Sequence, residues 1–112
     1  MQRGVVGLFE RWQLTDTEAS ILLGEISPRT LQRWKQGQYG RVGIDLAARM
    51  SNLLGIHRAL RMLLAYRERG YDWIRQPNSA FEDRRAFDVM LGGQITDLMR
   101  VRRYLDAQRA FW

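Results

Sequence analysis

The sequence has no cysteine, a single histidine and only two prolines among its 112 residues. Without cysteine, neither a disulfide framework nor a thiolate metal site is possible, so the fold cannot depend on an oxidising compartment and a cytoplasmic location is expected. The one histidine, His57, has no companions at metal-ligand spacing, so a packing or partner-facing role is favoured over metal binding. We therefore expect a protein without a metal or other cofactor.

Long apolar runs and catalytic clusters are lacking as well. The apolar stretch Val5–Phe9 is too short for a secretory signal, and no segment approaches the length of a membrane span. The carboxylates are scattered or placed where they act as helix caps and surface charges, and no nucleophile and base can be paired. The sequence predicts a protein that is not an enzyme, is not exported and has no membrane partner.

Negative charge is in short supply, mainly in the N-terminal half. The formal net charge is +6, from 18 Lys and Arg against 12 Asp and Glu. Residues 1–69 hold eleven of these cations and six of the carboxylates, whereas residues 70–112 hold seven and six. A basic excess favours a polyanionic partner because neutralising phosphates releases condensed counterions. The sign of the charge alone does not distinguish DNA from RNA or a membrane surface.

Apolar residues recur at helical spacing almost throughout, and no stretch alternates apolar and polar residues as a half-buried strand does. The predicted fold class is therefore all-α. A turn at Pro77-Asn78 and the Gly70 region indicate that a second subdomain begins near residue 70. Helices are expected over Val5–Trp12, Asp16–Leu23, Pro28–Gln36, Asp45–Glu68 with Gly55 as the candidate for a break or kink, Arg85–Leu91 and, after Gly92-Gly93, Ile95–Gln108.

Local end signals place two short helices around a tight turn in the first half. Thr15 and Glu18 match a capping box, in which each side chain satisfies a backbone donor of the other residue. Ser27 followed by Pro28 starts the next helix, since Pro needs no N–H at the first position. Gly24 ends the earlier helix by accepting a left-handed conformation. Two helices joined in this way form a helix-turn-helix, whose second helix enters the major groove of DNA.

The second helix of this pair has an apolar and a polar face. Leu31 and Trp34 point toward the core, and the opposite face is free to meet base edges or phosphates, where Arg reads guanine and Gln reads adenine. The alternative is a surface helix whose charges are simply solvated. Because one such helix reads few base pairs, at least a dimer is expected. The candidate DNA-binding residues are Ser27, Arg29, Thr30, Gln32, Arg33 and Lys35.

Two segments carry a resemblance to a known family. The first comprises Leu14–Ala19 and Ser27–Trp34, which look like a degenerate Xre-type helix-turn-helix. The second, Trp73–Phe81, has an aromatic-x-x-x-Pro-Asn pattern. Together they resemble the antitoxin family called Xre/MbcA/ParS, which is found with toxins of the RES type. That family commonly continues with a Gly-Arg/Lys-x-Pro element, and the stretch Glu82–Gly93 lacks this Gly and the second Pro.

The resemblance implies an N-terminal Xre-like helix-turn-helix bundle over residues 1–69, for DNA binding and dimerisation, and a small helical toxin-binding domain over residues 70–112. It implies that the C-terminal half docks on a RES-domain toxin, an enzyme that depletes NAD, and blocks its active site. It also implies repression of the shared operon by a homodimer or by a higher hetero-oligomer with the toxin. The candidate toxin-binding residues are Trp73, Asn78, Phe81, Arg100, Arg103, Arg109, Phe111 and Trp112.

Several of these residues have a second interpretation. Trp73 and Phe81 flank a turn and are expected to hold its shape while adjacent residues contact the toxin. Arginines on a polar helix face, such as Arg100 and Arg103, are more often solvated than bound to a partner. The Phe111-Trp112 pair would be an aggregation liability in water, so it either folds back on the core or fills a pocket on another chain.

Two other functions compete with an antitoxin. A free-standing transcriptional repressor of phage type would use the C-terminal half only to dimerise and would have no toxin partner. An RNA-binding helical module is disfavoured because single-strand recognition uses exposed stacking aromatics interleaved with basic residues, and the sequence offers no such platform.

Overall fold

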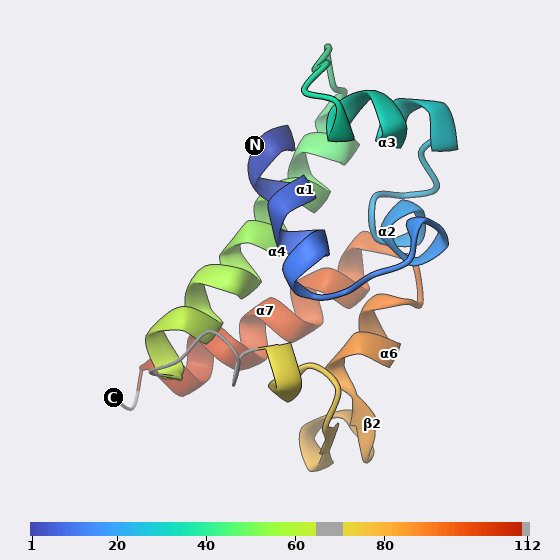
Figure 1. Ribbon diagram of the computed structural model, residues 1–112. Helices are drawn as coiled ribbons and strands as arrows, with labels where there is room; N and C mark the ends of the chain where they lie inside the picture. The colour runs from blue at the N-terminus through green and yellow to red at the C-terminus, as the bar shows by residue number, and fades with distance from the viewer. Residues whose placement is uncertain (65–70, 111–112) are drawn as a thin grey trace.

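The computed structural model describes residues 1–64 and 71–110, which fold almost entirely into helices (Figure 1). The first three helices gather beside the start of the long helix α4, and α7 crosses α4 from the other half of the chain. The predicted all-α fold class is confirmed, with one very small sheet added. The elements are α1 (Gln2–Arg11), α2 (Asp16–Leu22), α3 (Pro28–Lys35), α4 (Ile44–Leu63), β1 (Pro77–Asn78), η1 (Ser79–Phe81), β2 (Arg84–Arg85), α6 (Ala86–Met90) and α7 (Ile95–Arg109).

The first helix is longer than the sequence pattern indicated. α1 begins at Gln2 rather than at the predicted Val5. Its first turn packs on α4, since a Cβ on Gly4 would lie 3.5 Å from Leu54 Cδ2. The Gln2 side chain also donates a hydrogen bond to the Gly40 carbonyl at 2.9 Å. Tertiary contact thus holds a helical turn that has no side-chain cap of its own.

The helix-turn-helix forms as its end signals predicted. Thr15 Oγ1 accepts from the Glu18 amide at 3.1 Å, and Glu18 Oε1 accepts from the Thr15 amide at 2.8 Å, which completes the capping box. Ser27 Oγ accepts from the Thr30 amide at 3.1 Å at the start of α3. Gly24 has a φ of +79° in the turn, where a residue with a Cβ would be strained.

Two predictions about the long helix are wrong. α4 ends at Leu63 instead of Glu68, because Leu64 takes an extended conformation with φ −118° and ψ 123°. The helix also runs through Gly55 without a break. A Cβ on Gly55 would lie 2.6 Å from the guanidinium carbon of Arg102, so this glycine admits the crossing side chain of α7. Its function is close packing between helices.

The small antiparallel sheet was not predicted. It pairs Pro77 with Arg85 and Asn78 with Arg84 around the one turn of η1. Each strand has two residues, so no alternation of apolar and polar side chains can reveal it in the sequence. The turn predicted at Pro77-Asn78 is displaced, because these two residues form β1 and the chain turns after them, over residues 79–83.

One hydrophobic core joins both halves of the chain. The apolar face of α7 packs along α4, and α1 covers the same helix nearer its start. No helix in the described ranges is long and apolar enough to cross a membrane. The largest fully buried side chains of this core are Trp12, Phe81, Phe87, Leu8, Leu22, Leu23, Leu31, Met50, Leu53, Ile56, Ile74 and Met90.

Candidate functional site

The outer face of α3 holds the six residues predicted to meet DNA, and two of them are engaged in the helix cap. Ser27 Oγ receives the Thr30 amide and also lies 2.9 Å from Thr30 Oγ1. Both side chains sit at the N-terminal end of α3, where backbone N–H groups point outward. Their first task is therefore to fix the start of the helix.

Two more of the six are tied to α2 through one carboxylate. Gln32 Nε2 donates to Asp16 Oδ2 at 3.1 Å, and Lys35 Nζ forms an ion pair with Asp16 Oδ1. All three side chains are exposed, so the links are accessible to water and to competing anions. They orient α3 relative to α2 and lower the net positive charge of this part of the surface.

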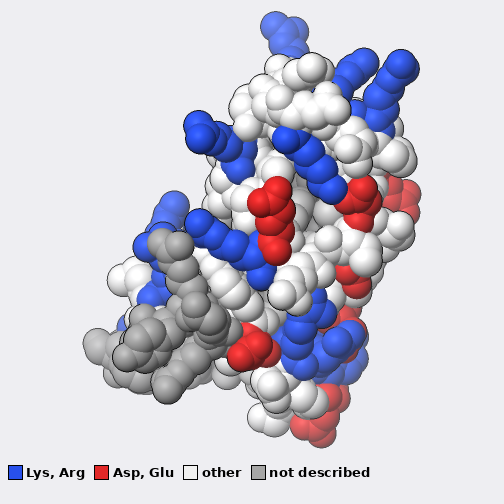
Figure 2. Space-filling model, in the orientation of Figure 1, with Lys and Arg blue, Asp and Glu red and all other residues white. Residues whose placement is uncertain are grey.

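Arg29 and Arg33 are the remaining pair. They lie four residues apart on the exposed face of α3, and neither guanidinium group makes a hydrogen bond or ion pair to another residue within the described ranges. Basic side chains project from the end of the molecule that carries α3 (Figure 2), and Asp16 is the carboxylate paired with that helix. The geometry leaves two guanidinium groups on this helix face free to meet an anionic partner.

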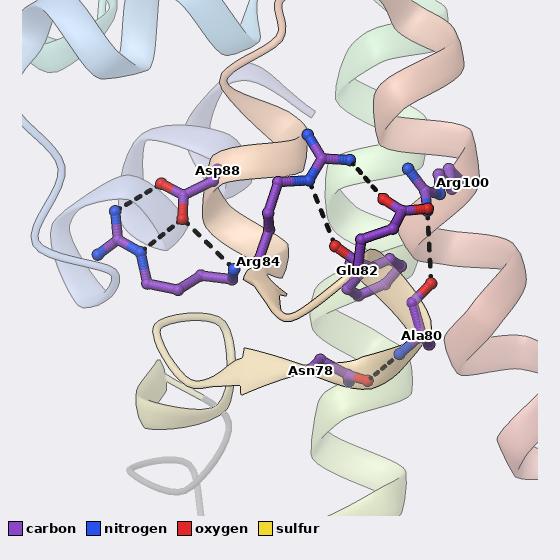
Figure 3. A network of polar contacts seen from close by, with 8 residues as sticks. Asn78, Ala80, Glu82, Arg84, Asp88 and Arg100 are labelled. Atoms are coloured by element: carbon purple, nitrogen blue, oxygen red, sulfur yellow. Dashed lines mark hydrogen bonds and ion pairs between the residues drawn. The ribbon is translucent and has the colours of Figure 1, made fainter.

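In the C-terminal half, the predicted Asn78 shapes the turn between the two short strands (Figure 3). Asn78 Oδ1 accepts from the Ala80 amide at 2.9 Å, and its backbone carbonyl accepts from the Asp83 amide at 3.0 Å. Glu82 and Asp83 then both adopt positive φ, at +54° and +62°. In the Xre/MbcA/ParS family, which this sequence resembles, a glycine is common in this segment. Glycine adopts such angles without steric cost.

A charged network closes the same turn against α7. Glu82 receives hydrogen bonds from Arg84 and from Arg100, each at 3.0 Å (Figure 3). The Arg84 hydrogen bond, together with the positive charge of Arg100, holds the pKa of Glu82 below its ordinary value. The Arg100 guanidinium also lies 5.3 Å from the centre of the Phe81 ring. Arg100 is therefore a structural partner of the turn.

A second ion pair sits at the start of α6. Arg85 donates to both oxygens of Asp88, at 2.8 and 2.6 Å, and the Arg85 amide lies 3.3 Å from the same carboxylate. The Arg85 hydrogen bonds lower the pKa of Asp88, and the same contact raises the pKa of Arg85. Neither Glu82 nor Asp88 was singled out in the sequence, although the charge alternation between residues 82 and 88 was a usable signal.

The predicted aromatic residues hold the turn from inside. Phe81 is 1% exposed and meets Tyr104 edge-on, with ring centres 5.3 Å apart. Trp73 is half-buried and stacks on Tyr104 at 6.1 Å. In this conformation the Phe81 ring is not accessible to a partner, and its place is in the core of the turn.

The other predicted toxin-binding residues are scattered along α7. Arg103 is exposed and has no ion pair among the described residues. Arg109 NH1 lies 3.7 Å from Asp106 Oδ1, a distance that leaves its guanidinium largely available. Phe111 and Trp112 lie outside the described residues. Among the residues that the structure does describe, no three metal-ligating side chains cluster.

Both halves of the chain match known protein families. Residues 53–110 match the antitoxin Xre/MbcA/ParS C-terminal toxin-binding domain, and residues 2–55 match the antitoxin Xre-like helix-turn-helix domain. A Sinorhizobium fredii protein described as uncharacterized protein y4oB is 43% identical over 100 residues, which are 89% of this chain and 77% of that protein.

A solved structure supports the same assignment. One chain in the crystal structure of the M. tuberculosis MbcT-MbcA toxin-antitoxin complex matches with a TM-score of 0.63 and 28% identity. The match covers 95% of this chain and 90% of that chain. The resemblance seen in the sequence is thereby confirmed, and it points to a non-enzymatic regulatory protein. The chain belongs to the Xre/MbcA/ParS antitoxin family and is a toxin–antitoxin antitoxin with an Xre-like helix-turn-helix domain.

Proposed function

We propose that this antitoxin binds a RES-type toxin, blocks the active site with which that toxin depletes NAD, and represses its own operon through α3. The observation that carries the first part is the match of residues 53–110 to a toxin-binding domain, together with the likeness of nearly the whole chain to one chain of a toxin–antitoxin complex. The proposed partners are the toxin and operator DNA, and the proposed location is the cytoplasm.

The division of labour follows the two halves of the chain. Residues 1–69 would bind DNA and form the homodimer, and residues 70–112 would supply the toxin-binding surface. The turn of β1, η1 and β2 supports the second assignment, because ion pairs and buried aromatics hold it in one shape. A surface fixed before binding loses less conformational entropy when a partner docks.

The toxin-facing residues follow from accessibility. Asn78 and Trp73 lie half-buried at the turn, and Arg103 and Arg109 add positive charge along α7. A site that binds an anionic dinucleotide is itself complementary to negative charge, so the arginines of α7 are suited to an acidic rim around the toxin's active site. Phe111 and Trp112 follow Arg109 in the sequence and would act as aromatic anchors in a toxin pocket.

Operator binding rests on the free guanidinium groups of α3. Arg29 and Arg33 lie on the exposed face of the helix that a helix-turn-helix inserts into the major groove. Arginine there hydrogen-bonds guanine or phosphate. Two copies in a homodimer would read two half-sites, and assembly with the toxin would give a higher hetero-oligomer.

The experiment is co-expression of this chain with the adjacent reading frame, followed by purification through this chain. The neighbour expressed alone should arrest growth and lower the cellular NAD concentration, and this chain should restore both. A stable complex in which purified toxin no longer consumes NAD supports the proposal.

Three results would contradict it in different ways. No complex and no toxicity would make a small free-standing repressor the better account. A toxic neighbour that leaves NAD unchanged would refute the RES assignment while keeping the antitoxin. A complex that still consumes NAD would refute active-site blocking.

A further inference from the structure

Arg49 on α4 is the one buried charged residue among those described, at 9% exposure. Its Nε donates to Asp45 Oδ2 at 3.0 Å, one turn earlier on the same helix. Its NH1 donates to the carbonyl of Gly93 at 2.9 Å, forty-four residues away. The Asp45 side chain is 70% exposed, so its ion pair is largely in water. Much of the desolvation cost of burying the Arg49 guanidinium is therefore offset by the hydrogen bond to a backbone carbonyl in the other half of the chain.

The same guanidinium fills the turn of the helix-turn-helix. A Cβ on Gly24 would lie 2.9 Å from Arg49 Nε and 3.1 Å from Cζ, closer than side chains normally approach. Gly24 also has a φ of +79°. Glycine is therefore required twice at this position, by the backbone angle and by the arginine that packs against it.

The segment after α6 completes the junction. Gly93, with φ +85°, presents its carbonyl to Arg49 and faces α2, since a Cβ on it would lie 3.6 Å from Ile21 Cγ2. In Figure 1 the chain between α6 and α7 passes beside α2. One side chain thus connects α4, the α2–α3 turn and the α6–α7 turn.

We propose that Arg49 is a positioning residue that joins the toxin-binding domain to the helix-turn-helix and sets the placement of α3. A displacement of the α6–α7 turn removes a hydrogen-bond partner from a buried cation, and the guanidinium then shifts against the α2–α3 turn. A toxin that moves the Gly93 carbonyl would therefore change the DNA affinity of α3. By thermodynamic reciprocity, DNA would change the toxin affinity by the same factor. This last consequence rests on the proposed function.

The junction itself is tested without toxin or DNA, by amide hydrogen exchange measured by NMR on the full chain. Arg49→Met should raise exchange several-fold at two places together, at Gly24 and Glu25 in the α2–α3 turn and at Gly93 in the α6–α7 turn. These amides are hydrogen-bonded in the folded chain, so they report local opening.

Arg75→Met is the matched control. Arg75 also links the two halves, since it donates to the Trp12 carbonyl at 2.6 Å, but it does not contact the α2–α3 turn. Its loss should leave Gly24 and Glu25 protected. Equal exposure of these amides in both variants would show general loosening and would overturn the proposal.

A pair of glycine variants tests the junction from its other side and does not remove the buried cation. Gly24→Ala and Gly37→Ala impose the same backbone strain, because both glycines have φ +79°, but Gly37 has no neighbour within 4 Å of a Cβ. Gly24→Ala should raise exchange at Gly93, far along the chain, whereas Gly37→Ala should not. Unchanged exchange at Gly93 in both variants would refute a connection through Arg49.

The coupling is measured as the ratio of operator affinities with and without saturating toxin. We expect this ratio to differ from one by roughly fivefold or more in the parent protein. In Arg49→Met this ratio of operator affinities should approach one. Arg75→Met should bind the operator and the toxin each with the affinity of the parent protein. A parent protein that binds both partners with a ratio of one overturns the coupling. A parent protein that binds no DNA contradicts the proposed operator function, and the exchange experiments then decide on the junction alone.

Discussion

At the scale of single residues, the turn between β1 and β2 combines a strained backbone with exposed ion pairs. Glu82 and Asp83 occupy left-handed conformations that cost L-residues free energy. The Glu82 carboxylate also pairs with Arg84 and Arg100. Asp83 is exposed, and no ion pair to it occurs in the described ranges. The two neighbours therefore differ in what a substitution should do.

Asp83→Gly should stabilise the fold by roughly 0.5–1 kcal/mol, because glycine accepts the positive φ without strain. Asp83→Ala removes the same side chain but keeps a Cβ, so it should be no more stable than the parent protein. Thermal unfolding of the three proteins measures the difference. Equal stability of the glycine and alanine variants would show that the backbone angle contributes nothing.

The carboxylates of Glu82 and Asp88 give this turn a predictable pH dependence. Their pKa values lie below the ordinary values of 4.5 and 3.8, so the stability they contribute is complete above those values and is lost as the pH falls through the lower pKa of the folded state. The stability difference between the parent and Glu82→Gln should therefore persist from pH 7 to about pH 5 and shrink below about pH 4.5.

Thermal unfolding of both proteins between pH 7 and pH 3 measures this difference. Glu10→Gln removes one exposed carboxylate that has no ion pair within the described ranges, so it controls for the change in net charge. A difference between the parent and Glu82→Gln that grows on acidification would have the wrong sign and would contradict the assignment.

The Phe111-Trp112 pair allows a test that leaves α7 intact. Replacing both residues by alanine should weaken toxin binding at least tenfold. At interface hot spots, truncation of an aromatic anchor often costs roughly 2 kcal/mol or more of binding free energy. Isothermal titration with the toxin measures affinity, and thermal unfolding of the free chain measures any role in folding. Full toxin affinity with lowered stability would assign the pair to the core instead.

At the scale of elements, most side chains of α3 pack in the core, cap the helix or pair with α2, and two arginines do none of these. Its inward side chains are buried, its N-terminal hydroxyls form the cap, and Asp16 holds Gln32 and Lys35. Arg29 and Arg33 have no such structural task among the described residues. Their replacement should therefore affect binding far more than folding.

Arg29→Ala with Arg33→Ala should weaken operator binding by about a hundredfold, since each arginine contact contributes roughly 1–3 kcal/mol. The slope of log affinity against log salt should also fall by about 2, because two fewer phosphates are neutralised. Arg58→Ala with Arg61→Ala removes the same charge from the exposed face of α4 and is the matched control.

Electrophoretic mobility shifts over a range of salt concentrations measure both quantities, and toxin neutralisation should survive in the α3 variant. Equal losses of DNA binding in the two variants would mean that only net charge matters. Equal loss of DNA binding and neutralisation in the α3 variant would contradict separate surfaces.

At the scale of the whole molecule, the two functional halves share one core. Leu98, Val101 and Leu105 of α7 pack into the same cluster as Leu53 and Leu60 of α4. Arg49 and Arg75 add polar links across the same boundary. Cooperative unfolding of both halves follows, because neither buries its apolar surface alone.

Leu105→Ala in the C-terminal half should cost about 2–5 kcal/mol and should unfold the helix-turn-helix at the same lowered temperature. Fluorotryptophan NMR distinguishes Trp34 in α3 from Trp73 near the turn, so the two halves are observed separately. Leu31→Ala in α3 is the reciprocal control and should lower the unfolding temperature reported by both Trp34 and Trp73. If Leu105→Ala left the unfolding temperature reported by Trp34 unchanged, the two halves would unfold independently.

The sequence by itself determined the features that depend on residues within about four positions of one another. The capping box at Thr15, the start of α3 at Ser27, the left-handed Gly24 and the all-α class all follow from such local rules. The exposed face of α3 follows as well, because the inward positions of Leu31 and Trp34 leave the opposite side to solvent.

Only the tertiary structure decided the features that join distant segments. The sequence pattern at Gly55 is also that of a helix break, but Arg102 of α7 crosses the helix there. Arg100 is a charge on a polar helix face, and only the fold brings Glu82 beside it. Asp45 is the one local partner of Arg49, and its other neighbours lie in two turns far away in the sequence, so its role at the junction had no local signal. Burial and pairing of a charge depend on which helices pack together, and that packing is a property of the whole chain.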